Sequence, residues 1–282
     1  MLKCFFVSDL HGVVSRYEKL TERIITDRPA IVLMGGDLLP HGFGVGSEFS
    51  DFFSEFLFRS FIRMKEEMQE DYPEILLILG NDDPKVNEIR FVEAQKSGLW
   101  RYMHKKKYDT DGFAFYGYAH VPPTPFRLKD WERYDVSRYV DPGCIHPAEG
   151  YFSMEPEEDI EFSTIQKHLA EMTGGRDLSG SVFLFHSPPY GTHLDRAALD
   201  GRMIDHVPLD VHVGSIAIQR FIEERQPLMT LHGHIHEASR ITGDWHQYIG
   251  KTLAVNAAWE GPELSLISFD LEDPATVQRE LI

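Results

Sequence analysis

The chain has 282 residues, and 42% of them are hydrophobic, which is enough to form a substantial core. Its formal net charge of −17, from 45 acidic and 28 basic residues, repels polyanions, so long nucleic acid is disfavoured as a partner. The one basic run, Lys105-Lys106-Lys107, is expected to be a solvated turn. Cys4 and Cys144 lack the spacing of a disulfide framework, and no apolar run approaches the ~18 residues of a membrane span. We therefore expect a cytoplasmic protein without a membrane segment.

The first part of the chain alternates predicted strands and helices. Short apolar runs predict strands over residues 2–8, 30–34 and 75–79, and helical spacing of apolar residues predicts a helix over 15–27. Residues 47–71 combine acidic side chains with an aromatic stripe, which predicts a long amphipathic helix. The stripe consists of Phe49, Phe52, Phe53, Phe56 and Phe61. We interpret it as packing in the core or between copies of the chain, and in the second case a homo-oligomer would form through helix 47–71.

The remainder continues the alternation and adds two long loops. Helices are predicted over 86–97, 156–172 and 215–225, and strands over 113–118, 182–186, 228–232, 252–256 and 264–269. Residues 119–150 and 190–213 are predicted loops, and loops this long in a compact domain are commonly functional. We expect both to lie over the functional site. Alternating strands and helices followed by closing strands suit an α/β fold with two packed sheets and helices outside.

Polar motifs follow five of the predicted strands, at the point where each strand ends. They are Asp9-Leu10-His11, Gly35-Gly36-Asp37, Gly80-Asn81-Asp82-Asp83, His186 and Gly233-His234-Ile235-His236. In α/β sheets this edge binds ligands, and carboxylates gathered there with imidazoles make a metal site. Alone, His186 is more typical of a core histidine and Asp9 of a helix cap, but the ordered set favours metal ligation. Because the motifs span most of the chain, we expect residues 1–282 to form a single domain.

The order of these motifs resembles the calcineurin-like metallophosphoesterase superfamily, over Asp9 to His236. The resemblance implies a four-layer αββα sandwich of two mixed β-sheets flanked by helices. It also implies two divalent metal ions with Asp37 as the bridging ligand. One ion would take Asp9, His11, Asp37 and His236, and the other would take Asp37, Asn81, His186 and His234. This ligand set suits Mn, Fe, Zn or Co better than Ca or Mg, which prefer oxygen ligands.

Asp82 departs from the pattern of that superfamily. Relatives often carry G-N-H-D or G-N-H-E, in which the histidine contacts the phosphate and can protonate the leaving group, whereas Asp82 occupies that place here. The resemblance then points toward phosphodiesters rather than monoesters. The expected catalytic residues are Asp37, Asn81, Asp82 and His234. The expected substrate-binding residues are Asn81, together with His120 and His193 from the two long loops.

The leading hypothesis is a metal-dependent phosphoesterase that hydrolyses a small phosphodiester through a dinuclear metal site and a bridging hydroxide. Two ions in such a site neutralise phosphate oxygens and lower the pKa of a bound water to near neutrality. Two alternatives stay open. One is a phosphomonoesterase or nucleotide phosphatase of the same fold, and the other is a non-catalytic metal-binding scaffold protein. In the enzymatic cases the partner is a small anionic phosphoester.

Overall fold

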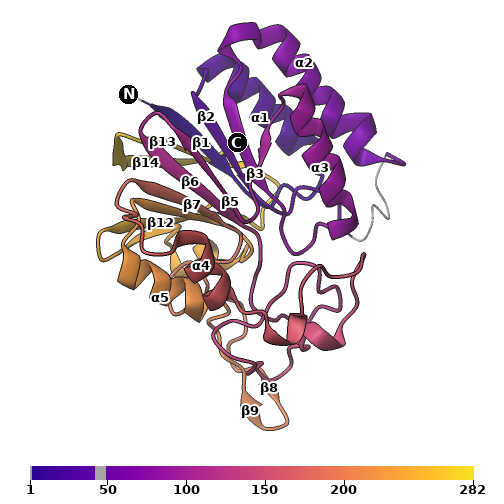
Figure 1. Cartoon of the computed structure of the whole chain (residues 1–282), viewed down its shortest axis with the longest axis vertical. Coiled ribbons are helices and arrows are strands. Elements are labelled where there is room, and N and C mark those ends of the chain that lie inside the picture. Colours follow the sequence, from indigo (N-terminus) through magenta and orange to yellow (C-terminus); the bar gives the residue numbers. More distant parts are fainter. Residues whose placement is uncertain (1, 42–48) are drawn as a thin grey trace.

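The computed structural model describes residues 2–41 and 49–282, and two six-stranded β-sheets dominate it (Figure 1). Four adjacent strands of the first sheet, from its middle to one edge, run parallel, and antiparallel pairs add two more strands on the other side. The order across this sheet is β14 (Asp273–Leu281), β13 (Ser265–Asp270), β1 (Lys3–Val7), β2 (Ile31–Gly35), β3 (Glu74–Ile78) and β4 (Arg101–Tyr102).

The second sheet is also mixed, with four parallel strands between two antiparallel edge strands. Its order is β11 (His246–Ile249), β12 (Thr252–Asn256), β10 (Met229–His232), β7 (Ser181–Phe185), β6 (Phe113–Tyr118) and β5 (Lys106–Thr110). A small hairpin, β8 (Met203–Ile204) and β9 (Val207–Pro208), projects from the molecule (Figure 1).

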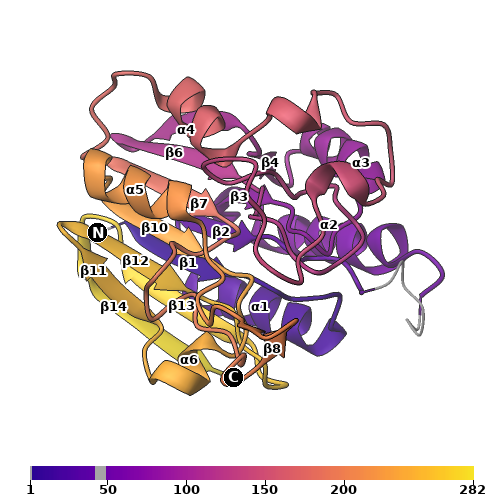
Figure 2. The same ribbon diagram turned by 90° about the horizontal axis from the view of Figure 1, so that it is seen from below.

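Helices cover the outer faces of both sheets (Figures 1 and 2). The first sheet carries α1 (Val14–Asp27), α2 (Phe58–Met68) and α3 (Glu88–Ala94), and the second carries α4 (Ile165–Thr173) and α5 (Ile216–Arg225). The short α6 (Ala238–Thr242) follows β10. This arrangement is the predicted four-layer αββα sandwich, so the fold class is confirmed. No helix within residues 2–41 and 49–282 is long and apolar enough to cross a membrane.

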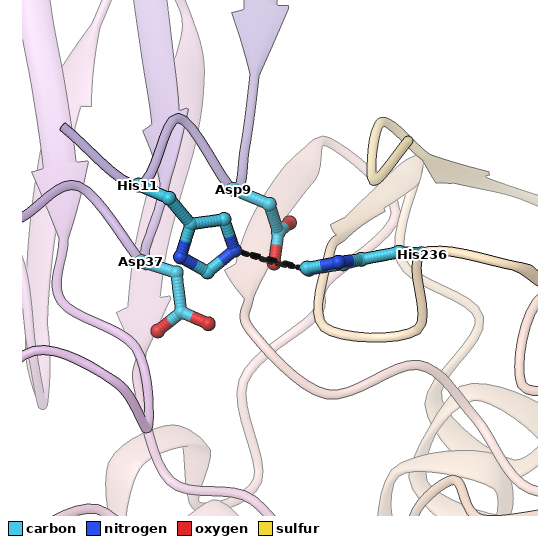
Figure 3. A group of neighbouring side chains, drawn as sticks. All are labelled: Asp9, His11, Asp37 and His236. Atoms are coloured by element: carbon cyan, nitrogen blue, oxygen red, sulfur yellow. Dashed lines mark hydrogen bonds and ion pairs between the residues drawn. The ribbon is translucent and has the colours of Figure 1, made fainter. Parts of the chain in front are cut away.

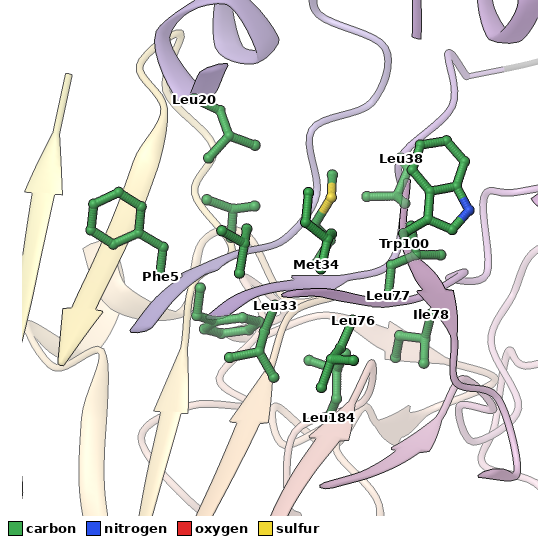
Figure 4. Close-up of a cluster of buried hydrophobic side chains, with 14 of the residues drawn as sticks. Phe5, Leu20, Leu33, Met34, Leu38, Leu76, Leu77, Ile78, Trp100 and Leu184 are labelled. Carbon is green, nitrogen blue, oxygen red and sulfur yellow. The ribbon is translucent and has the colours of Figure 1, made fainter. Parts of the chain in front are cut away.

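The central strands are buried on both faces, which explains their unbroken apolar sequences. Successive side chains of a strand point to opposite faces. Figure 4 shows this for Leu33 and Met34 on β2, and for Leu76 and Leu77 on β3. Leu33 and Leu76 lie in the layer between the sheets with Leu184 of β7, whereas Met34 and Leu77 face the helices. The two sheets therefore share one hydrophobic core, which holds the carboxyl ends of their strands together.

The helix predicted over 47–71 begins later than expected, and its aromatic stripe lies in the core. Residues 47 and 48 are outside the described part of the chain, and the helical stretch opens with a π-helical segment, Phe53–Leu57, that continues into α2. Phe52 and Phe61 are 5% and 0% exposed, and Phe61 packs edge-on against Trp100. These two rings belong to the core, whereas Phe49 and Phe56 are only partly buried, so an oligomer through this helix stays a prediction.

The helix predicted over 156–172 is wrong in its first half. α4 begins at Ile165, where the Thr164 side chain accepts a hydrogen bond from a backbone N–H of the first turn. Upstream, the Asp159 side chain accepts a hydrogen bond from the backbone N–H of Glu161 and holds a short 3-10 turn. Thr and Asp side chains that bond nearby backbone groups compete with a continuing helix, which explains the later start.

Four strands at sheet edges, β4, β5, β11 and β14, were not predicted. Lys106 and Lys107, expected in a solvated turn, instead open β5, and only Lys105 of that run lies in a turn. Edge strands commonly carry charged side chains, which discourage pairing with other chains. Their sequences therefore lack the apolar runs that identify central strands.

We predict that Phe61→Ala lowers the free energy of unfolding by about 3–5 kcal/mol, because the lost ring leaves a cavity in the core. Urea unfolding followed by circular dichroism, at two protein concentrations tenfold apart, measures this change. Arg59→Ala on the exposed face of the same helix is the control, with an expected change within about 0.5 kcal/mol. A midpoint that rises with protein concentration would show instead that the stripe stabilises an oligomer.

Candidate metal centre

Loops that leave the carboxyl ends of β1, β2, β3, β7 and β10 carry all seven predicted metal ligands. Backbone bonds tie these loops to one another. The N–H of His11 donates to the carbonyl oxygen of Asp37 at 2.8 Å, which joins the loops after β1 and β2. Nδ1 of His186, from the second sheet, lies 2.8 Å from the carbonyl oxygen of Gly35 in the first. The carboxyl ends of the parallel strands of both sheets thus meet at one place, and ligands of α/β folds bind at such strand ends.

Asp9, His11, Asp37 and His236 form one half of the centre (Figure 3). Each offers a ligand atom, and these four atoms all lie within 4.8 Å of one another. Nε2 of His236 is 3.0 Å from Oδ1 of Asp9 and 3.1 Å from Nε2 of His11. This group has the composition that the superfamily resemblance implies for one of the two ions.

Asp37, Asn81, His186 and His234 form the other half. Nε2 of His186 is 3.0 Å from Oδ1 of Asn81 and 3.3 Å from Oδ2 of Asp37. The rings of His186 and His234 have their centroids 5.2 Å apart. Asp37 therefore belongs to both halves, which is the position that a bridging carboxylate needs.

Four of the predicted ligands have a left-handed backbone, with φ of 58° at Asp9, 49° at His11, 53° at Asp37 and 72° at His234. This conformation is uncommon outside glycine, and strained backbone of this kind costs on the order of 1–3 kcal/mol and gathers at functional sites. A Cβ on Gly233 would collide with the carboxylate of Asp9, so glycine is needed for this close approach. The surrounding fold holds the ligands in a geometry that an isolated loop would not keep.

The two central carboxylates are buried: Asp9 is 1% exposed and Asp37 is 2% exposed. Burial by itself raises the pKa of a carboxyl group. The hydrogen bond and charge of His236 nevertheless hold the pKa of Asp9 well below its ordinary value, and His186 lowers the pKa of Asp37 to about 2. Among residues 2–41 and 49–282, Arg16 is the one Lys or Arg that hydrogen-bonds to a predicted ligand, and it bonds the backbone oxygen of Asp9.

The donor set fits two divalent ions. Burial lowers the pKa of His186, but the Asp37 carboxylate outweighs it and raises the pKa to about 10. Without a metal ion, a proton on the His186 imidazole therefore offsets the negative charge of the buried Asp37, because no Lys or Arg in the described residues pairs with that carboxylate. Metal ions bind deprotonated imidazoles and carboxylates, so a cation can take the place of those protons. Mixed nitrogen and oxygen donors suit Mn, Fe, Zn or Co.

Asp83 supports the centre, although the sequence analysis gave it no role. Its carboxylate is completely buried and accepts backbone N–H bonds from Leu38 at 3.0 Å, Leu39 at 2.7 Å and Gly80 at 3.0 Å. Burial raises the pKa of Asp83 to about 7, with the nearby Asp37 adding to the effect. Asp83 thus fixes the loops of Asp37 and Asn81 against each other. Its place in the G-N-x-D motif was the available signal.

Asp82 lies at the rim of the centre and is held in an ion pair. Its backbone N–H donates to Oδ1 of Asp37 at 2.8 Å, and its Oδ2 lies 2.8 Å from Nδ1 of His41. The His41 ring stacks on that of His11, with centroids 3.9 Å apart. Hydrogen bonding to Asp82 raises the pKa of His41. His41 could not be identified from the sequence, because no motif spacing connects it with the ligands.

The structure does not bring His120 and His193 into the centre. His120 is 1% exposed and packs against the rings of His104 and Trp131, with centroids 4.6 and 5.8 Å away. The structure thus places His120 in an aromatic enclosure rather than among the ligands of the centre, and its role in substrate binding stays a prediction. His193 is largely exposed and pairs with Asp244 at 2.6 Å, and its role in substrate binding stays a prediction.

His120, Glu158 and His168 form a second group with metal-ligand spacing. Two cations already occupy its carboxylate, since Nε of Arg133 lies 2.8 Å and Nζ of Lys105 lies 3.2 Å from Glu158 oxygens. A divalent ion there would be repelled by both. We interpret this group as a network of ion pairs under the 119–150 loop rather than as a metal site.

Comparison of the sequence with known families decides the assignment. A family model described as calcineurin-like phosphoesterase matches residues 2–238. The chain belongs to this family. Its members are metal-dependent phosphoric ester hydrolases that typically use a dinuclear metal site, in agreement with the clustered Asp and His residues. A search among curated proteins found no match.

Solved structures share the fold over nearly the whole chain. One is 18% identical with a TM-score of 0.61, and the match covers 99% of this chain and 98% of that one. The TT1561 protein of Thermus thermophilus is 15% identical with a TM-score of 0.56, covering 99% and 98%. A dimetal phosphatase from Danio rerio is 11% identical with a TM-score of 0.51, covering 94% and 92%. At these identities the likeness shows the fold.

We predict that Asp37→Asn lowers the bound metal from about two ions per chain and abolishes hydrolysis, because the amide lacks the charge and the second strong donor of a bridging carboxylate. Elemental analysis after loading with Mn²⁺ and gel filtration measures the metal content. Undiminished metal in the folded variant would contradict the bridging role.

We also predict that Asp83→Ala lowers both stability and metal content, although Asp83 is not a ligand. The change strips the acceptor from three buried N–H groups, each costing about 1–3 kcal/mol when unsatisfied. Asp135→Ala is the matched control, because Asp135 also accepts backbone N–H bonds, from Ile216 and Ala217 at the start of α5. The control should lose stability and keep its metal. Equal metal content in the two variants would remove the special role of Asp83.

Proposed function

We propose that the protein is a metal-dependent phosphodiesterase that hydrolyses a small phosphodiester. The observation that carries this proposal is the pair of donor groups that share Asp37, combined with Asp82 where the superfamily often has a histidine. Two divalent ions, when bound, would neutralise phosphate oxygens and supply an activated water. Asp37 would hold both ions, and Asn81, at the second half of the centre, would also face the phosphate. His234 would complete the catalytic set.

The charges around the centre support a diester over a monoester. Near a protein surface, two unit charges 4 Å apart interact by about 4 kcal/mol, and a monoester dianion carries roughly twice the charge of a diester. Asp82 adds negative charge at the rim of the centre. Arg16, the basic residue that hydrogen-bonds to a predicted ligand in the described part of the chain, is buried and bonds the backbone oxygen of Asp9. A doubly charged phosphate finds no exposed guanidinium or ammonium clamp among these contacts.

Phosphomonoester or nucleotide hydrolysis is the second candidate. The observation that favours it is the ion pair between Asp82 and His41, which offsets part of the Asp82 charge. A proton donor for a poor leaving group would also be needed, and general acid catalysis typically contributes 10²–10⁴-fold. A non-catalytic scaffold would keep the metal ligands but show no turnover.

We predict that the Mn²⁺-loaded protein hydrolyses bis-p-nitrophenyl phosphate with a higher kcat/KM than p-nitrophenyl phosphate. A chelator should remove both activities, and Asp37→Asn, assayed alongside, should have neither. Preference for the monoester would favour the second candidate, and the absence of turnover on both esters, with two ions bound, would favour a scaffold. A wider panel of cyclic nucleotides and other diesters then identifies the substrate class.

A further inference from the structure

We propose that His41, held in place by Asp82, is a phosphate-contacting residue of this centre. This inference rests on the proposed function, because it assigns one more contact to the same phosphoester. His41 lies on the loop after β2, and the carboxylate of Asp82, from the loop after β3, is its partner.

The position of His41 follows from three contacts at the rim. Its ring lies over that of His11, with centroids 3.9 Å apart and an angle of 17° between the ring planes. Its Nδ1 is 2.8 Å from Oδ2 of Asp82, and the backbone N–H of Asp82 is in turn bonded to Oδ1 of Asp37. His41 is therefore connected to both halves of the centre while its own side chain stays 61% exposed.

The second ring nitrogen of His41 is the atom that we assign to the phosphate. Nε2 has no hydrogen-bond partner in the part of the chain that the structure describes. Because Asp82 engages Nδ1, the ring cannot turn freely, and Nε2 points away from that carboxylate. Fixed hydrogen-bond donors beside a metal centre are effective because they need no reorganisation when charge develops on the substrate.

A third metal site is the competing interpretation, since His11, His41 and Asp82 have donor atoms within 4.8 Å of one another. The stacking argues against it. A histidine donates its lone pair in the plane of its ring, toward an ion about 2.0–2.1 Å away. The rings of His11 and His41 are stacked and nearly parallel, so the in-plane lone pairs of the two rings lie in separate planes and cannot both point at one ion.

The test measures binding of inorganic phosphate to the Mn²⁺-loaded protein by isothermal titration calorimetry. We expect His41→Ala to weaken phosphate binding by on the order of tenfold or more, since a hydrogen bond to a charged group is lost, with the metal content unchanged. His41→Gln, which keeps an N–H donor without a titrating ring, should recover most of the affinity. The control is Arg28→Asn, which removes an exposed cation that pairs with Asp71. Arg28 precedes β2 and so lies at the amino end of that strand, away from the centre at its carboxyl end, and this variant should bind phosphate as the wild type does.

The role of Asp82 is tested by a double-mutant cycle. The effect of His41→Ala should fall from about tenfold to under threefold when it is made in an Asp82→Ala background, because His41 is no longer oriented there. A His41→Ala loss of less than twofold in the wild-type background, or a wild-type protein that does not bind phosphate, overturns the proposal. Equal losses in both backgrounds overturn the orienting role of Asp82. Phosphate binding without turnover would sink the proposed function and leave this inference standing.

Discussion

Two buried carboxylates lie at the edge where both sheets end, and the rest of the site follows from their charge. Asp9 and Asp37 are almost fully enclosed, and the ion pairs available to them in the described chain are with histidines. Burying a charge without a partner is costly, so the groups around it must supply positive charge or bind a cation. The arrangement of imidazoles satisfies both requirements, since the same nitrogens can carry protons or hold metal ions.

The fold supplies the position of these groups, and local bonds supply their orientation. Apolar strands buried on both faces fix where the loops begin, and the shared core keeps the two sheet edges together. The loops themselves are strained, with left-handed backbone at four predicted ligands. Asp83 and Arg16 hold that strained backbone through bonds to buried amides and to a carbonyl oxygen. The centre therefore depends on residues that never touch an ion or a substrate.

Much of this could be predicted from the sequence, for a physical reason. Each ligand follows a continuous apolar strand, so its location is encoded locally, and the predicted groups meet as expected. His41 could not be found in this way, because its place beside His11 depends on how a loop folds back. The surroundings of His120 could not be predicted for the same reason, because tertiary packing decides whether a loop histidine faces a site or an aromatic enclosure. The charged edge strand β14 lacked an apolar pattern altogether.

The whole site depends on one carboxylate, Asp37, which two ions would share. Electron paramagnetic resonance of the fully Mn²⁺-loaded protein tests it directly, because two ions about 3.5–4 Å apart with a common bridge are magnetically coupled. We expect the multiline spectrum of an exchange-coupled pair, which Asp37→Asn should convert to the signal of isolated ions. A wild-type spectrum made only of uncoupled six-line Mn²⁺ signals, at two ions per chain, would contradict it.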